Sequence, residues 1–257
     1  LEEVMFDAEH FFDGFKNNRK YSLDVLSRAF ESGAKWIVLC DTNGGTLPHE
    51  LEEIINEVKK VIPKNNLGVH FHNDTDNATY NSIHSALLGV RQIQGTFNGL
   101  GERCGNSNLV NVASNLVLKM GFDCKIQSNI KKITSASRMI DETLNRQSLP
   151  NLPFVGTSAF AHKGGLHISA VEKDPRCYEH IDPALVGNQR VMVVSNQSGK
   201  SNLINKLKKL KINTRGKDKL ITDFLKILKN QEFLGYAYDG AEASFELLAR
   251  RKFTKFK

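Results

Sequence analysis

The chain of 257 residues contains no apolar run of about 18 residues, the length that a helix needs to cross a bilayer. We therefore expect no membrane-spanning segment and no membrane partner. Cysteine is also scarce, and the four residues show neither C-x-x-C spacing nor a dense disulfide framework. This usage, with the lack of a signal-peptide pattern, favours a reducing compartment and predicts a cytoplasmic protein. The chain starts at Leu1 without an initiator Met, so import into an organelle stays open as an alternative.

The composition excludes several classes of protein. With 40% hydrophobic and 25% charged residues, the chain is neither fibrous, collagenous nor wholly disordered. Its formal net charge of +7 is uneven, because residues 1–150 carry a net −2 and residues 151–257 a net +9. Much of this excess lies between residues 200 and 219. A phosphate-binding surface, for nucleic acid or a phosphorylated cofactor, is one interpretation of such a cluster.

The solvent face of an amphipathic helix is the other interpretation of the basic stretch. Apolar residues recur there at helical spacing, at Leu203, Ile204, Leu207 and Leu210. Because no aromatic residues interleave with the lysines to stack on bases, we favour the helix face and predict no nucleic-acid partner. A nucleotide-binding P-loop is excluded as well, since Val194 occupies the position where the glycine before Gly199-Lys200 is required.

The first half of the chain repeats one pattern: a short apolar run, a polar or glycine-containing loop and a segment of helical period. The predicted strands are Val4–Ala8, Trp36–Cys40, Leu67–His72 and Ile93–Phe97. The predicted helices are Tyr21–Ser32, His49–Val61, Ala78–Leu88 and Leu109–Lys119. Alternating strands and helices at this spacing predict an α/β fold with a parallel sheet covered by helices.

Four β-α units are half of an eight-stranded (β/α) barrel, which needs about 250 residues. After Gly121 the repeat stops: Ile126–Asn145 reads as one more helix, and Leu149–Pro153 as a linker. We therefore predict that residues 1–148 are the C-terminal half of a TIM barrel, about strands five to eight. Residues 149–230 are predicted to form a mainly helical appended subdomain. The chain is thus expected to lack the first half of the barrel.

Two histidines at the end of the third predicted strand are the sharpest chemical feature. Residues i and i+2 of a strand point the same way, so His70 and His72 place two imidazoles on one face. The C-terminal ends of parallel barrel strands are where active sites lie. Two imidazoles supply two of the three ligands typical of a catalytic divalent-metal site. A pair of histidines without a metal is the alternative.

Polar groups also follow the other three strands. Glu9 follows the first strand, Thr42 begins the loop Asp41–Gly45, and the glycine-rich loop Phe97–Asn106 follows the fourth. Glycines allow a ligand to approach the backbone, Asn106 offers an amide oxygen and Thr42 could bond a carboxylate. Ordinary turns and a solvent-facing carboxylate are the alternatives. Polar groups at four strand ends of one sheet favour a single active site.

Three of these segments carry a more specific resemblance. HFHND, DTNGG and NGLGERCGN together resemble the isopropylmalate, citramalate and homocitrate synthases of the DRE-TIM metallolyase group. The residues around Asp7–Phe12, CDTNGGTLP and YDGAEASFELL are most similar to the citramalate synthase branch. The resemblance implies an acyltransferase that joins acetyl-CoA to a 2-oxo acid, pyruvate being favoured, by Claisen condensation with release of coenzyme A. It also implies that residues 231–257 begin a C-terminal regulatory region.

The resemblance assigns roles by motif. The metal ligands for a divalent ion (Zn, Mn or Mg) would be His70, His72 and Asn106. The residues near the substrates would be the catalytic Glu9, His167 and Tyr178 and the substrate-binding Thr42, Asn98 and Gly99. The family delivers its catalytic His and Tyr across a homodimer, so the resemblance implies a cross-subunit active site. His162 is the weaker histidine candidate in the His167 segment.

The chain departs from the family at one essential motif. The sequence D-x-T-L-R-D-G, which supplies a third metal ligand and an arginine, occurs nowhere in the 257 residues. We therefore expect the chain by itself to have little or no condensing activity. A metal-dependent lyase or aldolase resembling hydroxymethylglutaryl-CoA lyase is one alternative, although HFHND and the segment containing His167 argue against it. A degenerate copy retained as a non-catalytic assembly subunit is the other.

Overall fold

The computed structural model describes the chain except for residues 1, 193–199, 237, 239–240 and 255–257. The chain divides into two compact units, Leu1–Ser148 and Leu149–Lys257, which we call unit 1 and unit 2 and describe separately. Among the described residues, no helix has both the length and the apolar character that crossing a membrane requires.

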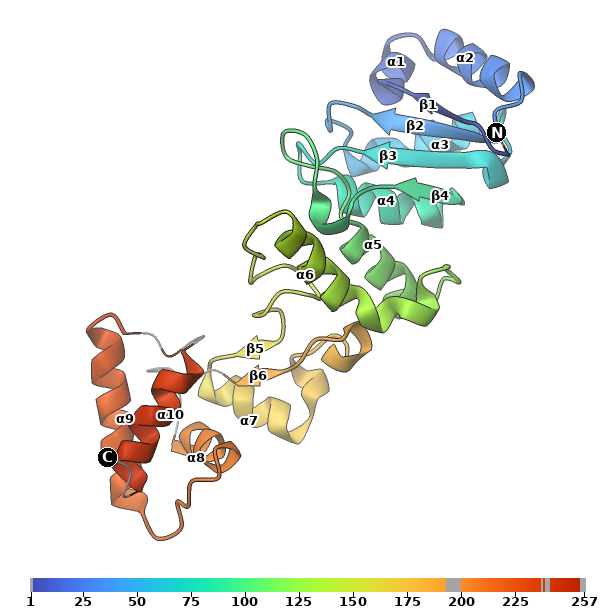
Figure 1. Cartoon of the computed structure of the whole chain (residues 1–257). Helices are drawn as coiled ribbons and strands as arrows, with labels where there is room; N and C mark the ends of the chain where they lie inside the picture. The colour runs from blue at the N-terminus through green and yellow to red at the C-terminus, as the bar shows by residue number, and fades with distance from the viewer. Residues whose placement is uncertain (1, 193–199, 237, 239–240, 255–257) are drawn as a thin grey trace. The chain divides into compact units, whose positions relative to one another are not determined.

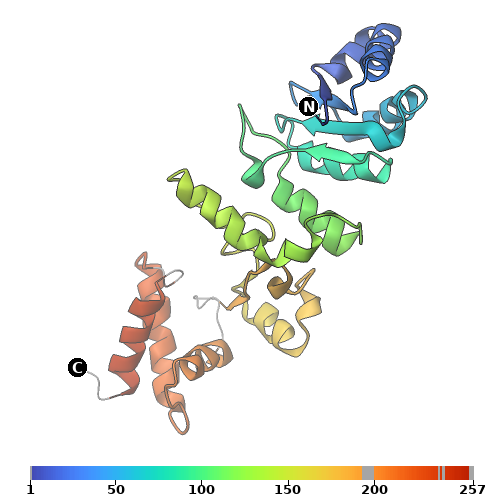
Figure 2. The same cartoon turned by 45° about the vertical axis from the view of Figure 1, so that its right-hand side comes forward.

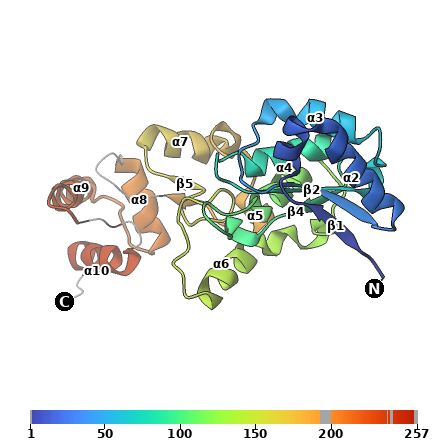
Figure 3. The ribbon, with the colours of Figure 1, turned by 90° about the horizontal axis from the view of Figure 1, so that it is seen from above.

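Unit 1 is an α/β structure with a four-stranded parallel sheet, as predicted (Figure 1). The strands pair in chain order: β1 Met5–Ala8, β2 Trp36–Asp41, β3 Leu67–Phe71 and β4 Gln92–Gln94. The helices are α1 Phe11–Asn17, α2 Arg19–Glu31, α3 Leu51–Val58, α4 Ala78–Leu87, α5 Leu109–Ser114 and α6 Ile133–Thr143. Figure 3 views this unit from above, with α3 and α4 beside the strands.

The register of the strands separates an apolar face of the sheet from a polar one. Ile37 pairs with Leu67, and Asp41 with Phe71, so these positions share the face that packs on the helices. Phe71 is fully buried there, with its ring centroid 5.3 Å from that of Phe12 in α1. The alternate residues point to the opposite face, where Cys40 pairs with His70. The hydrophobic core therefore fixes one side of each strand and leaves the other side to the candidate site.

The first β-α connection and the fourth strand differ from the prediction. The first β-α connection contains an extra helix, α1, whose Phe11, Phe12 and Phe15 are buried. The fourth strand ends at Gln94 rather than Phe97, because beyond it the Thr96 backbone N–H donates to the Ser107 carbonyl oxygen of the next loop instead of pairing with β3. Gly95 allows this approach, since a Cβ there would be 2.5 Å from the same oxygen.

The segments after β4 are also less regular than predicted. The helix expected over Ile126–Asn145 is a 3-10 helix, Gln127–Lys132, followed by α6. The helix expected over Leu109–Lys119 is α5 followed by a π-helical turn, Asn115–Lys119. Figure 2 shows these elements following the sheet along the chain.

Unit 2 combines a short parallel ladder with helices. The ladder pairs β5 Ala161–His162 with β6 Val191–Met192. The helices are α7 Gly165–Lys173, α8 Lys200–Lys209, α9 Asp218–Phe233 and α10 Glu242–Phe253. Leu203 and Leu207 of α8 are fully buried against α9 and α10, so the apolar face predicted for the basic stretch is confirmed. Val194 and Gly199 of the rejected P-loop and Gly240 of the family motif lie outside the described residues.

Candidate metal and substrate site

The two histidines after the third strand lie together on the polar face of the sheet. His70 is the penultimate residue of β3, and His72 follows the strand and bridges to Asn106 in the loop after β4. Their ring centroids are 5.1 Å apart. Phe71 between them points into the core, which holds the backbone that presents both imidazoles. The structure thus brings together all three residues predicted to be metal ligands.

Within the described part of the chain, two buried atoms of this cluster have no hydrogen-bond partner. They are Nδ1 of His72 and Oδ1 of Asn106. The amide nitrogen of Asn106 donates to the Leu100 carbonyl oxygen at 3.0 Å, which fixes the opposite end of the amide as a free acceptor. Buried acceptors without a donor are costly unless a ligand satisfies them. A metal ion is one such ligand.

The protonation of the cluster suits a cation. Burial lowers the pKa of His72, and the neighbouring His70 and Arg103 lower it further, so its imidazole is neutral at physiological pH. Burial, with the charges of Glu9 and Asp7, raises the pKa of the Cys40 thiol, beside His70 on the sheet, to about 12, so this thiol is protonated in the metal-free chain. The residues present therefore fit a divalent metal. Among the described residues no group of three or more His, Cys, Asp or Glu could hold a metal, so this donor set is two imidazoles and one amide oxygen.

Glu9 and Thr42 meet at the ends of β1 and β2. The Thr42 hydroxyl donates to Glu9 Oε2 at 2.6 Å and accepts from the His10 backbone N–H at 2.8 Å. The single hydroxyl proton of Thr42 is therefore engaged by Glu9.

Asn98 and Gly99 lie in the loop after β4, but the Asn98 amide faces α6. Its nitrogen donates to the Ser137 carbonyl oxygen and to Asp141 Oδ1, and its oxygen accepts from the Ser137 hydroxyl. Gly99 has a positive φ of 67° beside Asn106. The side chain of Asn98 thus connects the loop after β4 to α6. Substrate binding by Asn98 and Gly99 stays a prediction.

Arg103 joins three of the strand-end loops and was missed as a site residue by sequence reasoning. Its guanidinium binds both oxygens of Asp74, at 2.7 and 3.0 Å, and donates to the Thr42 carbonyl oxygen at 2.8 Å. The bond from Arg103 lowers the pKa of Asp74. No local pattern could have shown this pair, because Asp74 is 29 residues away in sequence; Arg103 also lies 3.7 Å from Oε2 of its neighbour Glu102. This pair holds the loops around His72 and Thr42 in place.

Replacement of Gly105 by alanine should displace this loop. Gly105 has φ +92°, and a Cβ there would lie 1.9 Å from the Gly99 carbonyl oxygen. We expect a loss of unfolding free energy of more than about 1 kcal/mol, together with weakened Zn²⁺ binding because Asn106 follows directly. Gly121→Ala is the matched control, since φ is +67° there but a Cβ meets no atom within 4 Å. Equal effects of the two substitutions on denaturant unfolding and Zn²⁺ titration would contradict the expectation.

Unit 2 brings together the two residues predicted to be catalytic there. The rings of His167 in α7 and Tyr178 lie with centroids 4.3 Å apart, and both side chains are exposed. His162, the weaker candidate, is instead buried and binds Glu179 Oε1 at 3.0 Å through Nε2. Arg190 binds both oxygens of the same carboxylate. Because Glu179 follows Tyr178 directly, this buried cluster anchors the Tyr178 segment.

The buried Glu179 cluster predicts an acid-sensitive stability of unit 2. The bonds from Arg190 lower the pKa of Glu179, and the bond from His162 adds to this effect. A carboxyl whose folded pKa is depressed stabilises the protein above its unfolded pKa, about 4.3, and loses that contribution as pH falls through the folded value. Thermal unfolding between about pH 5 and pH 2 should therefore be less pH-dependent in Glu179→Gln than in the unmodified chain.

Asp174→Asn is the matched control for the Glu179 experiment. Asp174 is also paired with an arginine, Arg176, but its pair is exposed to solvent. An exposed ion pair contributes little to stability, because solvent screens its charges. An unchanged pH profile in Glu179→Gln, or the same change in both variants, would refute the assigned role of Glu179.

The fold and the site together define a class: a parallel α/β domain with two histidines and an asparagine brought together at the ends of its strands. The HMGL-like family model matches residues 4–140, more than half of the chain, and the model described as homocitrate synthase post-HMGL domain-like matches residues 154–232. The chain belongs to the HMGL-like family.

Within this family, the chain is similar to individual curated synthases. The (R)-citramalate synthase of Aquifex aeolicus is 50% identical to the chain over 253 residues, which are 98% of the chain and 48% of that protein. The (R)-citramalate synthase of Geobacter sulfurreducens is 47% identical over 98% of the chain and 47% of its own length. A 2-isopropylmalate synthase of Parabacteroides distasonis is 35% identical over 88% of the chain and 46% of its own length. The predicted similarity to the citramalate synthase branch is confirmed, and the chain spans about half the length of the curated relatives it matches.

Proposed function

We propose that this chain is the portion of a citramalate synthase that carries the metal-binding histidines, and that the whole protein condenses acetyl-CoA with pyruvate. The observation that carries the proposal is the half-buried cluster of His70, His72 and Asn106, present in a chain that is 50% identical to an (R)-citramalate synthase. The similarity spans both units, since it covers 98% of the chain.

The residues at the strand ends are suited to the two substrates. A divalent metal bound by His70, His72 and Asn106 would supply Lewis-acid polarisation of the ketone. The Thr42 hydroxyl would donate to the carboxylate of pyruvate and in doing so give up its bond to Glu9. Binding of the 2-oxo acid would thereby free the Glu9 carboxylate at the moment it is needed near the reacting carbons. Binding of the 2-oxo acid is thereby coupled to release of the Glu9 carboxylate, because both accept the same hydrogen bond from Thr42.

Proton removal from the acetyl methyl group needs a base near neutral pH, a role that suits histidine. His167, with Tyr178 against its ring, is proposed for this step together with Glu9. The enolate then attacks the ketone carbon of pyruvate, and hydrolysis of the thioester releases coenzyme A. We propose that His167 and Tyr178 act on a partner protomer of a homodimer, as in the family, with cytoplasmic location also kept as a proposal.

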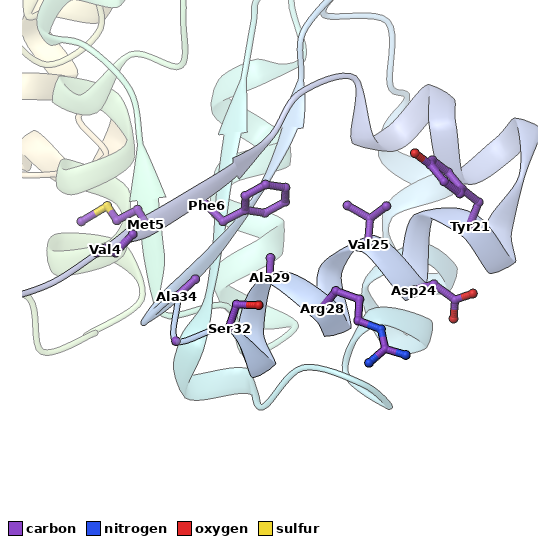
Figure 4. Close-up of a pocket in the computed structure, with 11 residues that line it drawn as sticks. Val4, Met5, Phe6, Tyr21, Asp24, Val25, Arg28, Ala29, Ser32 and Ala34 are labelled. Carbon is purple, nitrogen blue, oxygen red and sulfur yellow. The ribbon is translucent and has the colours of Figure 1, made fainter.

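We further propose that unit 1 is the C-terminal half of a (β/α)8 barrel, with residues 149–230 as an appended subdomain and 231–257 as the start of a regulatory region. In the described part of the chain, β1 pairs only with β2, so its outer edge is open. Beside this edge lies an apolar groove of about 660 Å³ between β1 and α2, lined by Phe6, Val25 and Ala29 (Figure 4). An open strand edge next to an apolar groove suits a further strand and its helix.

A chimera tests the proposed function, because the chain spans only 48% of the length of the Aquifex aeolicus (R)-citramalate synthase. The chain would replace the 253 matching residues of the Aquifex aeolicus (R)-citramalate synthase, and coenzyme A release from acetyl-CoA and pyruvate would be followed with a thiol reagent. We expect release in the chimera, its loss in the His70→Ala chimera, and little or none from the chain alone. A folded chimera that is inactive with pyruvate, or more active with 2-oxoisovalerate, would contradict the proposal.

A further inference from the structure

The polar face of the sheet carries a chain of hydrogen bonds behind His70. Nδ1 of His70 lies 2.9 Å from Oε1 of Gln94 in β4, the residue that pairs with it across the strands. Nε2 of Gln94 lies 3.2 Å from Oδ1 of Asp7 in β1, 87 residues away in sequence. Asp7, Gln94 and His70 therefore form a continuous line across the polar face.

The direction of this line follows from the chemistry of its first member. A carboxylate only accepts hydrogen bonds, so Asp7 requires the amide nitrogen of Gln94 to face it. The amide oxygen of Gln94 must then face His70, and an oxygen acceptor requires a proton on Nδ1 of His70. The imidazole is thereby held with its lone pair on Nε2.

We propose that Asp7 and Gln94 are positioning residues that fix the tautomer and orientation of His70, so that Nε2 is presented for metal binding. This inference rests on the proposed metal site but concerns residues that the motif comparison assigned no role. Partners of this kind, on the far nitrogen of a ligating histidine, raise metal affinity by about 10- to 100-fold.

A neighbouring glutamine gives a matched control. Gln92 points to the same face two residues earlier in β4, but its Nε2 donates to the Met5 sulfur at 3.1 Å, whereas the hydrogen bond to His70 comes from Gln94. Its Oε1 is buried without a hydrogen-bond partner in the described chain. Gln92→Leu therefore makes the same change on the same strand outside the hydrogen-bonded line.

Two variants interrupt the line at different points. Gln94→Leu removes the acceptor of His70 directly. Asp7→Asn leaves every contact atom of His70 in place, but an asparagine amide both donates and accepts, so the Gln94 amide is free to turn over. Asp7 is connected to His70 only through Gln94. A change in the tautomer of His70 after Asp7→Asn is therefore expected only if the line of hydrogen bonds sets that tautomer.

The experiment has two readouts on the 257-residue chain. Long-range ¹H–¹⁵N spectra of the metal-free protein report the tautomer of His70, and calorimetric titration with Zn²⁺ reports affinity. We expect a protonated Nδ1 in the unmodified chain and in Gln92→Leu, loss of this single tautomer in Gln94→Leu and Asp7→Asn, and about 10- to 100-fold weaker Zn²⁺ binding in both.

The two readouts separate this proposal from the proposed function. An Nε2-protonated His70 in the unmodified chain, or an unchanged tautomer in both Gln94→Leu and Asp7→Asn, would overturn the positioning role. If the tautomer responds as expected while the unmodified chain fails to bind Zn²⁺, the positioning role stands and the metal site of the proposed function is refuted.

Discussion

Replacing His70 with alanine is expected to abolish retention of a divalent metal by the chain. The described donor set contains two imidazoles and one amide oxygen, so loss of one imidazole leaves a single strong ligand. Zn²⁺ content after dialysis, measured by elemental analysis, should fall from about one equivalent to the background of the protein surface. The substitution should cost little stability, because the side chain lies on the polar face of the sheet.

His49→Ala is the matched control for this experiment. His49 is exposed in the turn before α3 and has no histidine partner in the candidate site. Its substitution should leave the Zn²⁺ content unchanged. A chain that keeps its metal after His70→Ala, or loses it equally after His49→Ala, would refute the ligand assignment.

The second large effect is expected for Phe71→Ala. Phe71 is fully buried between α1 and the sheet, with its ring against Phe12. Removal of a buried phenylalanine ring costs about 3–5 kcal/mol, a large share of the roughly 5–15 kcal/mol that stabilises a typical domain. The backbone on both sides of Phe71 carries the two histidines, so we also expect weaker Zn²⁺ binding.

The single tryptophan, Trp36, allows this loss to be measured in unit 1 alone. Trp36 is the first residue of β2, so its fluorescence in a denaturant titration reports the unfolding of the sheet. Tyr21→Ala is the control in the same unit, because Tyr21 is 66% exposed and its loss should change the unfolding free energy by no more than about 0.5 kcal/mol. An unfolding free energy of Phe71→Ala within about 1 kcal/mol of that of the unmodified chain would contradict the assigned place of Phe71 in the core.

The strands of unit 1 were predictable because each is a short apolar run in a repeating pattern. The parallel order follows from alternation of strands and helices, and the two-residue period of a strand places His70 and His72 on one face. The first helix, α1, was missed because a β-α repeat leads one to expect a single helix after each strand, whereas two helices follow β1. The spacing of Phe11, Phe12 and Phe15 could have indicated it.

The ends of elements near the site were less predictable, for a physical reason. The fourth strand stops where Gly95 meets the Ser107 backbone, a contact between separate segments that no local pattern encodes. The same holds for the long-range polar contacts. Asp7 and Gln94, and likewise Glu179 and His162, are ordinary residues in sequence and acquire a role only when the fold brings them together.

Anomalous diffraction at the zinc absorption edge, from crystals of the chain grown with Zn²⁺, is the most direct test of whether His70 and His72 bind a divalent metal at the strand ends of the sheet. We expect an anomalous peak bonded to both imidazoles and next to the Asn106 amide oxygen. Zinc bound only at other residues, with none between these two imidazoles, would contradict it.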